Sequence, residues 1–294
     1  MNAARKRKNI LRGLALLALL CCLPQVPARA QDIRLLMPSS AGTGEAVLVT
    51  AVALQARHFV FSWKGKTLTV PAVTGPEGSY AQVLLPVPLE EKGARLSLRA
   101  SVEGKPAVQR DIQVVQKQYP VQELKVERGY VEPPPAVQAR IAEEARRSRE
   151  ILGTFSLRRQ WRLPMQRPVP GEVSSAFGLR RVFNGQPRSQ HKGLDLRGAA
   201  GTPVLAMADG TVALAEELYF SGNVVYIDHG LGLFSIYAHL SAIDVSPGQQ
   251  VSGGQVIGKV GSTGRATGPH LHLGCYALGM AVDPAPLMEA GKQP

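Results

Sequence analysis

Apolar and polar residues alternate along most of residues 31–118. Between Arg95 and Val102, for example, apolar residues stand at all the even positions and polar residues at all the odd ones. A period of two places one face of a strand in a core and the other face in water. Strands at this spacing are typical of an immunoglobulin-like β-sandwich, with a small barrel as the alternative. The predicted strands are 33–37, 46–54, 58–63, 67–70, 80–85, 95–102 and 108–115.

The pattern changes in residues 119–164, which we predict to be a linker. Glu132 is followed by three prolines, and these cannot join the interior of a sheet. Residues 136–152 then carry apolar positions at helical spacing, and Gly153 is a suitable C-terminal stop. We expect this helix to pack between two domains as a spacer.

Residues 165–290 combine many glycines with short apolar runs, a pattern that predicts antiparallel hairpins and no long helix. The chain is therefore predicted to be mainly β throughout. One of its six histidines, His58, lies in the first predicted domain, where it is expected to be a half-buried strand residue. The other five lie in residues 165–290, so the candidate chemistry is located there.

Two short segments have the composition of a metal site. In a strand, His270 and His272 would point to the same face while Leu271 packs behind them. His191 and Asp195 are expected in a loop that runs into a strand, where they would add one nitrogen and one oxygen. Each pair alone is a weak signal, and Asp195 could equally cap a turn.

Together the segments are a stronger signal. Imidazole nitrogen and carboxylate oxygen are ligands that Zn²⁺ accepts readily, whereas Ca²⁺ requires oxygen ligands. Two histidines and one aspartate would leave a fourth position open for water, as in catalytic zinc sites. His239 lies between the two segments, and this position favours a functional role over that of a core residue. His229 is expected to be structural.

Residues 1–30 have the pattern of a secretory signal peptide. A basic segment at 5–12 precedes an apolar stretch at 14–23, which is too short to span a bilayer as a helix. An Ala-Arg-Ala sequence ending at residue 30 supplies the cleavage site; an uncleaved membrane anchor is the alternative. A lipoprotein signal is excluded because leucine rather than a small residue precedes Cys21. We expect export across the inner membrane to the periplasm, with no stable membrane span after cleavage.

Removal of this segment changes the charge and the cysteine count. It holds six Lys and Arg residues and no acid, so the formal net charge falls from +12 to +6. A modest positive charge suits an anionic neighbour such as a wall polymer or a lipid surface. Nucleic acid is not an expected partner, because the chain has no motif that binds it. Cys275 is left as the only cysteine, which excludes an internal disulfide. On a strand it would face away from His272, and we expect it to be buried and apolar.

The motifs in residues 165–290 resemble those of the M23 metallopeptidases, the lysostaphin or LytM type. They occur together and in order: His191-x3-Asp195, Tyr237-Ala238-His239-Leu240 and Thr267-Gly268-Pro269-His270-Leu271-His272, with Phe177-Gly178-Leu179-Arg180 upstream. The resemblance implies an antiparallel β peptidase domain with its metal in an open groove. It implies that His191, Asp195 and His272 bind one Zn²⁺ per chain, and that His239 and His270 are catalytic but do not bind the metal. The implied substrate is the peptide cross-bridge of peptidoglycan. From the sandwich-plus-linker layout we expect D,D cross-links of the Gram-negative type rather than polyglycine bridges.

We expect His270 to act as the general base and His239 to stabilise the oxyanion or protonate the leaving amine, although the two roles could be reversed. Two other functions remain to be weighed. A non-catalytic member of the same fold would bind the wall or activate another hydrolase. A biotinyl or lipoyl carrier would need a lysine at a hairpin tip, and Lys259 lies in a strand-like run instead.

Overall fold

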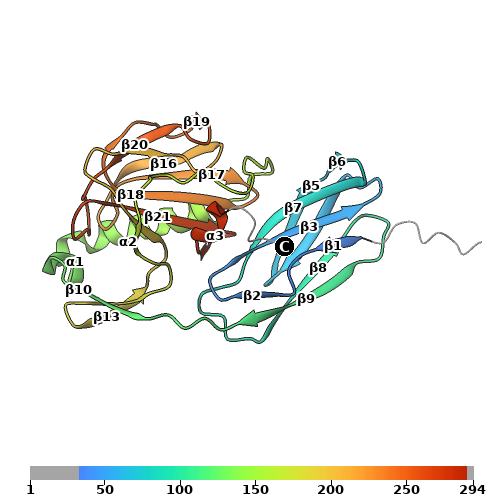
Figure 1. Ribbon diagram of the computed structural model, residues 1–294, viewed down its shortest axis with the longest axis horizontal. Helices are drawn as coiled ribbons and strands as arrows, with labels where there is room; N and C mark the ends of the chain where they lie inside the picture. Colours follow the sequence, from blue (N-terminus) through green and yellow to red (C-terminus); the bar gives the residue numbers. More distant parts are fainter. Residues whose placement is uncertain (1–32, 290–294) are drawn as a thin grey trace, which may run out of the picture.

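The computed structural model of the protein describes residues 33–289 (Figure 1). Strands dominate it, as the sequence predicts, and residues 33–115 form two sheets. The first has the order β1-β3-β7-β6, with β1 (Arg34–Leu36), β3 (Ala46–Ala53), β7 (Gly78–Pro86) and β6 (Val73–Gly75). The second has the order β2-β9-β8-β4-β5, with β2 (Ser40–Gly42), β9 (Val108–Val115), β8 (Arg95–Ser101), β4 (His58–Trp63) and β5 (Lys66–Pro71).

These two sheets share one apolar core. Phe59 and Phe61 of β4 are fully buried, and they belong to the same cluster as Val49 of β3 and Val83 of β7 in the other sheet. Alternate residues of each strand therefore point inward, as the period of two requires. All seven predicted strands are present. The strands β2 and β6 were not predicted, because three residues are too few to show an alternation. The immunoglobulin-like classification of this sandwich stays a prediction.

Most strands of the second part form one ten-stranded antiparallel sheet. Its main path is β11 (Val173–Ser175), β14 (Leu194–Arg197), β21 (His270–Ala277), β18 (Leu233–Ile243), β17 (Gly222–Gly230), β16 (Gly210–Leu218) and β19 (Gln250–Val251). Off this path, β20 (Val256–Val260) pairs with β15 (Pro203–Leu205) and with β18, and β22 (Met280–Val282) pairs with β21. The helix α3 (Ala285–Met288) follows. The prediction of antiparallel pairing without a long helix is confirmed for this region.

A small fourth sheet joins the predicted linker to this part. The strand β10 (Val121–Leu124) pairs in parallel with β12 (Arg180–Phe183), which pairs antiparallel with β13 (Gln186–Gln190). Part of the predicted linker is therefore a strand that pairs with the second part of the chain. Its strand was missed because four residues with a mixed burial pattern give no periodic signal.

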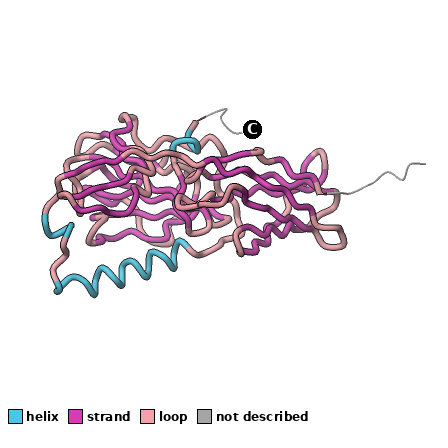
Figure 2. Tube along the Cα trace, turned by 90° about the horizontal axis from the view of Figure 1, so that it is seen from below, coloured by secondary structure: helices cyan, strands magenta, loops and turns pink. Residues whose placement is uncertain are grey.

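The predicted helix exists as α2 (Pro135–Leu152), preceded by the short α1 (Arg128–Val131). The expectation that it packs between two domains is wrong. Leu152 packs in a cluster with Leu218, Val224 and Phe234, so α2 covers the outer face of the ten-stranded sheet (Figure 2). The apolar stripe of the helix matches an apolar face of the sheet. Packing the two together removes both from water, and this favours the observed position of α2.

The two parts contact each other directly. Leu84 of β7 belongs to the core cluster of the ten-stranded sheet, and Leu231 and Leu278 belong to the core of the sandwich. The Lys66 ammonium donates to the Leu278 carbonyl over 2.7 Å. The domain limits given above stay predictions, but the sandwich and the sheet share apolar surface.

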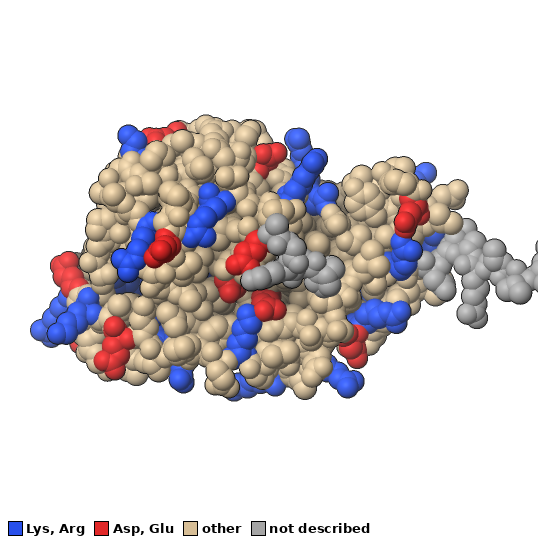
Figure 3. Space-filling model, viewed as in Figure 1, with Lys and Arg blue, Asp and Glu red and all other residues tan. Residues whose placement is uncertain are grey.

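The predicted signal peptide, with Cys21 and Cys22, lies outside the described residues. Among residues 33–289, no helix is long and apolar enough to cross a membrane. On the face shown in Figure 3, basic and acidic side chains are interspersed.

His229 is structural, as expected. Its side chain is buried, with Nδ1 2.7 Å from the Asp209 carbonyl and Nε2 2.7 Å from the Ser235 hydroxyl. A carbonyl only accepts, so Nδ1–H donates to it and Nε2 accepts from Ser235. The ring is held neutral in this way, and burial lowers the pKa of His229.

This histidine should make the fold sensitive to acid. Because the pKa of His229 is lowered in the folded state, its stabilisation is complete above the unfolded pKa of about 6.5 and declines as the pH falls below that value. The slope from this one group should approach about 1.4 kcal/mol per pH unit. Urea unfolding of the metal-free protein and of His229→Asn, between about pH 7.5 and about pH 5, checks this. An equal slope in the two proteins would contradict it.

Candidate metal centre

The pairing of β14 with β21 brings the two halves of the candidate site together. Asp195 lies directly opposite His272, and Arg197 lies opposite His270. His270 and His272 share one face of β21, while Leu271 between them is fully buried. His191 lies in the loop between β13 and β14, as the spacing to Asp195 predicts.

Three side chains converge on one point. The ligand atoms of His191, Asp195 and His272 all lie within 4.8 Å of one another. Asp195 Oδ1 is 3.0 Å from His191 Nε2 and 2.7 Å from His272 Nδ1, and those two nitrogens are 3.1 Å apart. Two nitrogens and one oxygen in this arrangement suit Zn²⁺.

The ring of His191 is oriented for this purpose. Its Nδ1 lies 2.8 Å from the Ala176 carbonyl, which accepts the Nδ1 proton and leaves the Nε2 lone pair facing Asp195 and His272. Burial lowers the pKa of His191 to about 4, so the ring is neutral near pH 7. A neutral imidazole is the form that binds a metal.

Gly193 allows this close packing. A Cβ atom at Gly193 would lie 2.5 Å from Cε1 of His272 and 2.7 Å from the Leu273 carbonyl oxygen. No side chain fits there, so the loop can pass directly beside the His272 ring only with glycine.

The Asp195 carboxylate is buried and fully engaged. Burial alone would raise the pKa of Asp195, but its interactions with the neighbouring His191 and His272 outweigh burial and hold that pKa well below its usual range. Arg181 of β12 donates to Oδ2 over 2.6 Å. With Oδ2 held by the guanidinium, Oδ1 is the oxygen that faces the two histidines.

His239 occupies a strained backbone position beside these ligands. Its φ is 64°, in the left-handed region, at an irregularity in the pairing of β18. Its N–H donates to the Ser221 carbonyl over 2.9 Å, and Nδ1 lies 2.8 Å from the Thr263 carbonyl. Such strain persists only where the surroundings enforce it, and it concentrates at functional sites. Burial, with His272 and His270 nearby, lowers the pKa of His239 to about 3.

The His270 side chain also lies near Asp195 and His239. Its Nδ1 lies 2.8 Å from the Gly268 carbonyl, and Nε2 is 3.9 Å from Asp195 Oδ1. Its ring centroid is 5.0 Å from that of His239, which in turn is 5.9 Å from that of His272. In both His239 and His270 the Nδ1 proton is donated to a carbonyl, which leaves Nε2 free to accept a proton.

A solved structure of similar architecture decides the family. A crystal structure from Pseudomonas aeruginosa, described as a peptidase M23, aligns with a TM-score of 0.66 and 30% identity over 86% of this chain and 96% of that one. The chain belongs to peptidase family M23. The sequence model that defines this family matches residues 189–284. This range contains the four histidines and the aspartate of the site.

Curated relatives of this M23 protein resemble it over a shorter region. A DD-carboxypeptidase/endopeptidase Mpg of Neisseria meningitidis is 45% identical over 112 residues, which are 38% of this chain and 26% of that protein. A peptidoglycan DD-endopeptidase ShyA of Vibrio cholerae is 43% identical over 112 residues, again 38% of this chain and 26% of that protein. The chain thus matches about a quarter of the length of these relatives.

The structure brings His191, Asp195 and His272 together with His239 and His270 nearby, along with partners that the sequence did not indicate. Cys275 is buried with its sulfur 3.7 Å from that of Met207, outside the ligand group, as expected. Arg181 was missed, because an arginine next to Arg180 in a short strand gives no sign that one of the two reaches a buried carboxylate. Ser175 was also missed; its hydroxyl lies 3.3 Å from His191 Nδ1.

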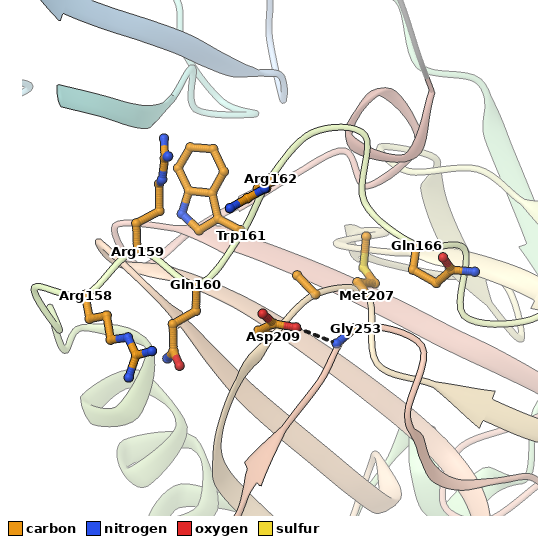
Figure 4. Close-up of a pocket in the computed structure, with 10 residues that line it drawn as sticks. Arg158, Arg159, Gln160, Trp161, Arg162, Gln166, Met207, Asp209 and Gly253 are labelled. Carbon is orange, nitrogen blue, oxygen red and sulfur yellow. Dashed lines mark hydrogen bonds between the residues drawn. The ribbon is translucent and has the colours of Figure 1, made fainter. Parts of the chain in front are cut away.

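The M23 site is distinct from the pocket shown in Figure 4. That pocket has a volume of about 460 Å³ and is lined by the segment from Arg158 to Arg162 and by Asp209, which accepts a hydrogen bond from the Gly253 N–H. It shares no residue with the metal centre.

Arg181 should support metal binding through Asp195. We expect Arg181→Met to weaken Zn²⁺ binding by about 10- to 100-fold, the usual effect of removing the partner of a ligand. The lost orientation of Asp195 should outweigh the relief of charge repulsion. Competition with a chromophoric chelator measures the affinity, and circular dichroism confirms the fold. The neighbouring exposed Arg180→Met is the matched control, and equal affinities for the two variants would refute the role.

The strain at His239 can be measured as stability. We expect His239→Gly to be more stable than His239→Ala by about 1 kcal/mol, because only alanine keeps a Cβ at positive φ. Urea unfolding compares the two. At the neighbouring Ala238, which has ordinary strand geometry, Ala238→Gly should destabilise instead. The same sign at both positions would show that His239 is not strained.

Proposed function

We propose that this protein is an exported, zinc-dependent endopeptidase that hydrolyses peptide cross-links of bacterial peptidoglycan. One observation carries the proposal: three ligand atoms converge beside two further histidines, each with a free Nε2. The names of the M23 relatives, one a peptidoglycan DD-endopeptidase, support this substrate. The basic and apolar pattern of residues 1–30 supports export, with the periplasm as the destination.

We assign His191 Nε2, His272 Nδ1 and one oxygen of Asp195 as the ligands of a single Zn²⁺. The donor set fits, since it offers two neutral nitrogens and one carboxylate and leaves room for water. When bound, the ion supplies a Lewis acid for the scissile carbonyl and lowers the pKa of its water toward about 7.

His270 is our choice for the general base. Its Nδ1–H is held by the Gly268 carbonyl, so Nε2 presents a lone pair on the side of Asp195. His270 is half-buried, which lets it return its proton to solvent after each turnover. A base must reach the proton that it removes, and Nε2 lies within about one water of the ligands.

His239 is our choice for the group that stabilises the oxyanion or protonates the leaving amine. Its Nδ1–H is already donated to the Thr263 carbonyl, so Nε2 must receive a proton before it can donate one. A pKa of about 3 keeps this ring neutral at rest. The proton that His239 donates would therefore be the second proton of the attacking water, which His239 takes after His270 has removed the first, and then passes to the leaving nitrogen.

The two alternative functions, a carrier module and a non-catalytic wall-binding or hydrolase-activating protein, have less support. A carrier module requires an exposed lysine at a hairpin tip, but Lys259 lies within β20 and pairs with Pro203. A purely non-catalytic role leaves the strained His239 and the free Nε2 of His270 without a purpose.

The proposal predicts that metal binding and catalysis can be separated. His270→Ala should lower the rate of peptidoglycan cleavage by at least about 100-fold while zinc stays bound, because its ring is not a ligand. Asp195→Ala should lose both, because it removes a ligand. Zymography on purified peptidoglycan and zinc content per chain are the measurements.

The control is His58→Ala in the sandwich, which should keep both properties. Mass spectrometry of the released fragments identifies the bond that is cut. Wild-type rates in His270→Ala with one zinc per chain would rule out the role of His270, and an inactive zinc-loaded wild type would rule out the enzyme.

A further inference from the structure

Arg265 holds a positive charge beside the metal centre. Its guanidinium carbon lies 4.9 Å from the ring centroid of Phe183 and 4.6 Å from that of Phe220. The backbone N–H of Arg265 also donates to the Phe220 carbonyl over 2.9 Å. Phe183 ends β12, and Phe220 lies between β16 and β17. The guanidinium is thus fixed in place by rings from two separate segments.

No residue in the described range 33–289 neutralises this charge. Among the described residues, the Arg265 side chain makes no hydrogen bond and no ion pair, whereas Arg181 is paired with Asp195 and Arg188 donates to the Val131 carbonyl. The buried nitrogens without a partner belong to Arg147, Trp161 and Arg181, so the N–H groups of Arg265 reach solvent. Their hydrogen-bonding capacity is available to a ligand.

The loop that carries Arg265 also orients both candidate catalytic histidines. Its Thr263 carbonyl accepts from His239, and its Gly268 carbonyl accepts from His270. Arg265 lies between these two points of contact. A ligand group bound to its guanidinium would therefore be held next to the reacting bond.

The charge balance of the site favours an anion. Burial, with the charges of Arg181 and Arg188 nearby, lowers the pKa of Arg265 to about 10, which still leaves it charged near pH 7. Arg181 is paired with Asp195, and Arg188 interacts with Glu132, whereas the only charged neighbours that affect Arg265 among the described residues are these two arginines. A planar guanidinium pairs best with a carboxylate, through two parallel hydrogen bonds.

We propose that Arg265 binds a carboxylate of the peptide substrate, on the carbon that bears the scissile nitrogen. This rests on the proposed function and specifies its substrate. A cross-link through the side-chain amine of a diamino dicarboxylic acid has a carboxylate at that position. A glycine bridge has none, and amidation removes the charge.

Two cross-linked peptides test the proposal, identical except that this carboxylate is free in one and amidated in the other. Wild type should prefer the free carboxylate by about 10- to 100-fold in kcat/KM, the usual effect of one charged hydrogen-bonded pair. Arg265→Gln should lose this preference by slowing cleavage of the free-carboxylate peptide, while the rate on the amidated peptide stays within about 3-fold of wild type. Arg265→Lys keeps the charge without the planar fork and should retain an intermediate preference.

The exposed Arg162→Gln, remote from the metal centre, should behave as wild type. If Arg265→Gln slows both peptides equally, Arg265 only holds the loop and the inference is wrong. A wild type without a preference for either peptide also overturns it.

Binding separates this inference from the proposed function. Calorimetry with the zinc-loaded His270→Ala protein should show about 10-fold tighter binding of the free-carboxylate peptide, and this difference should vanish when Arg265→Gln is added. If wild type cleaves neither peptide but this binding difference is present, the enzyme proposal fails and the carboxylate site stands. If wild type and Arg265→Gln cleave both peptides at equal rates, the enzyme proposal stands and the carboxylate site is ruled out.

Discussion

The register between β14 and β21 is the constraint on which the candidate site depends. Asp195 faces His272 across this pair, and the side-chain period of two places His270 on the same face. A slip of one residue would turn these side chains into the core and bring Leu271 and Leu273 to the surface. The burial of those two leucines therefore specifies the metal centre indirectly, because it fixes which face each histidine occupies.

The buried carboxylate makes a second demand. An ionised carboxyl group is costly to bury without partners. Asp195 meets this cost with two imidazoles and with Arg181, which comes from a different sheet. The β10-β12-β13 sheet thus contributes to the electrostatics of the metal centre, although Asp195 and His272 lie on the ten-stranded sheet. The same sheet supplies Phe183, against which Arg265 rests.

Much of this architecture was predictable because it is periodic. The seven strands of the sandwich and the two faces of β21 follow from alternation, and the helix follows from its apolar stripe. The partners of these elements were not predictable in the same way. The site of α2 depends on the apolar outer face of β16–β18, the pairing of β10 depends on a segment some sixty residues away, and Arg181 is recognisable only once its distance to Asp195 is known. These features depend on contacts between residues that are far apart in the sequence, and a local pattern carries no information about such contacts.

The parallel pairing of β10 with β12 has a consequence for how the catalytic region can be isolated. Residue 165 is the limit that composition indicates, but a fragment cut there would lack β10 and leave one edge of β12 unpaired. It would also lose Gln122, whose side-chain oxygen accepts from Ser175 beside His191. A fragment that keeps these contacts therefore begins before Val121, so that the peptide connecting the sandwich to the ten-stranded sheet is itself a structural part of the region around the metal centre.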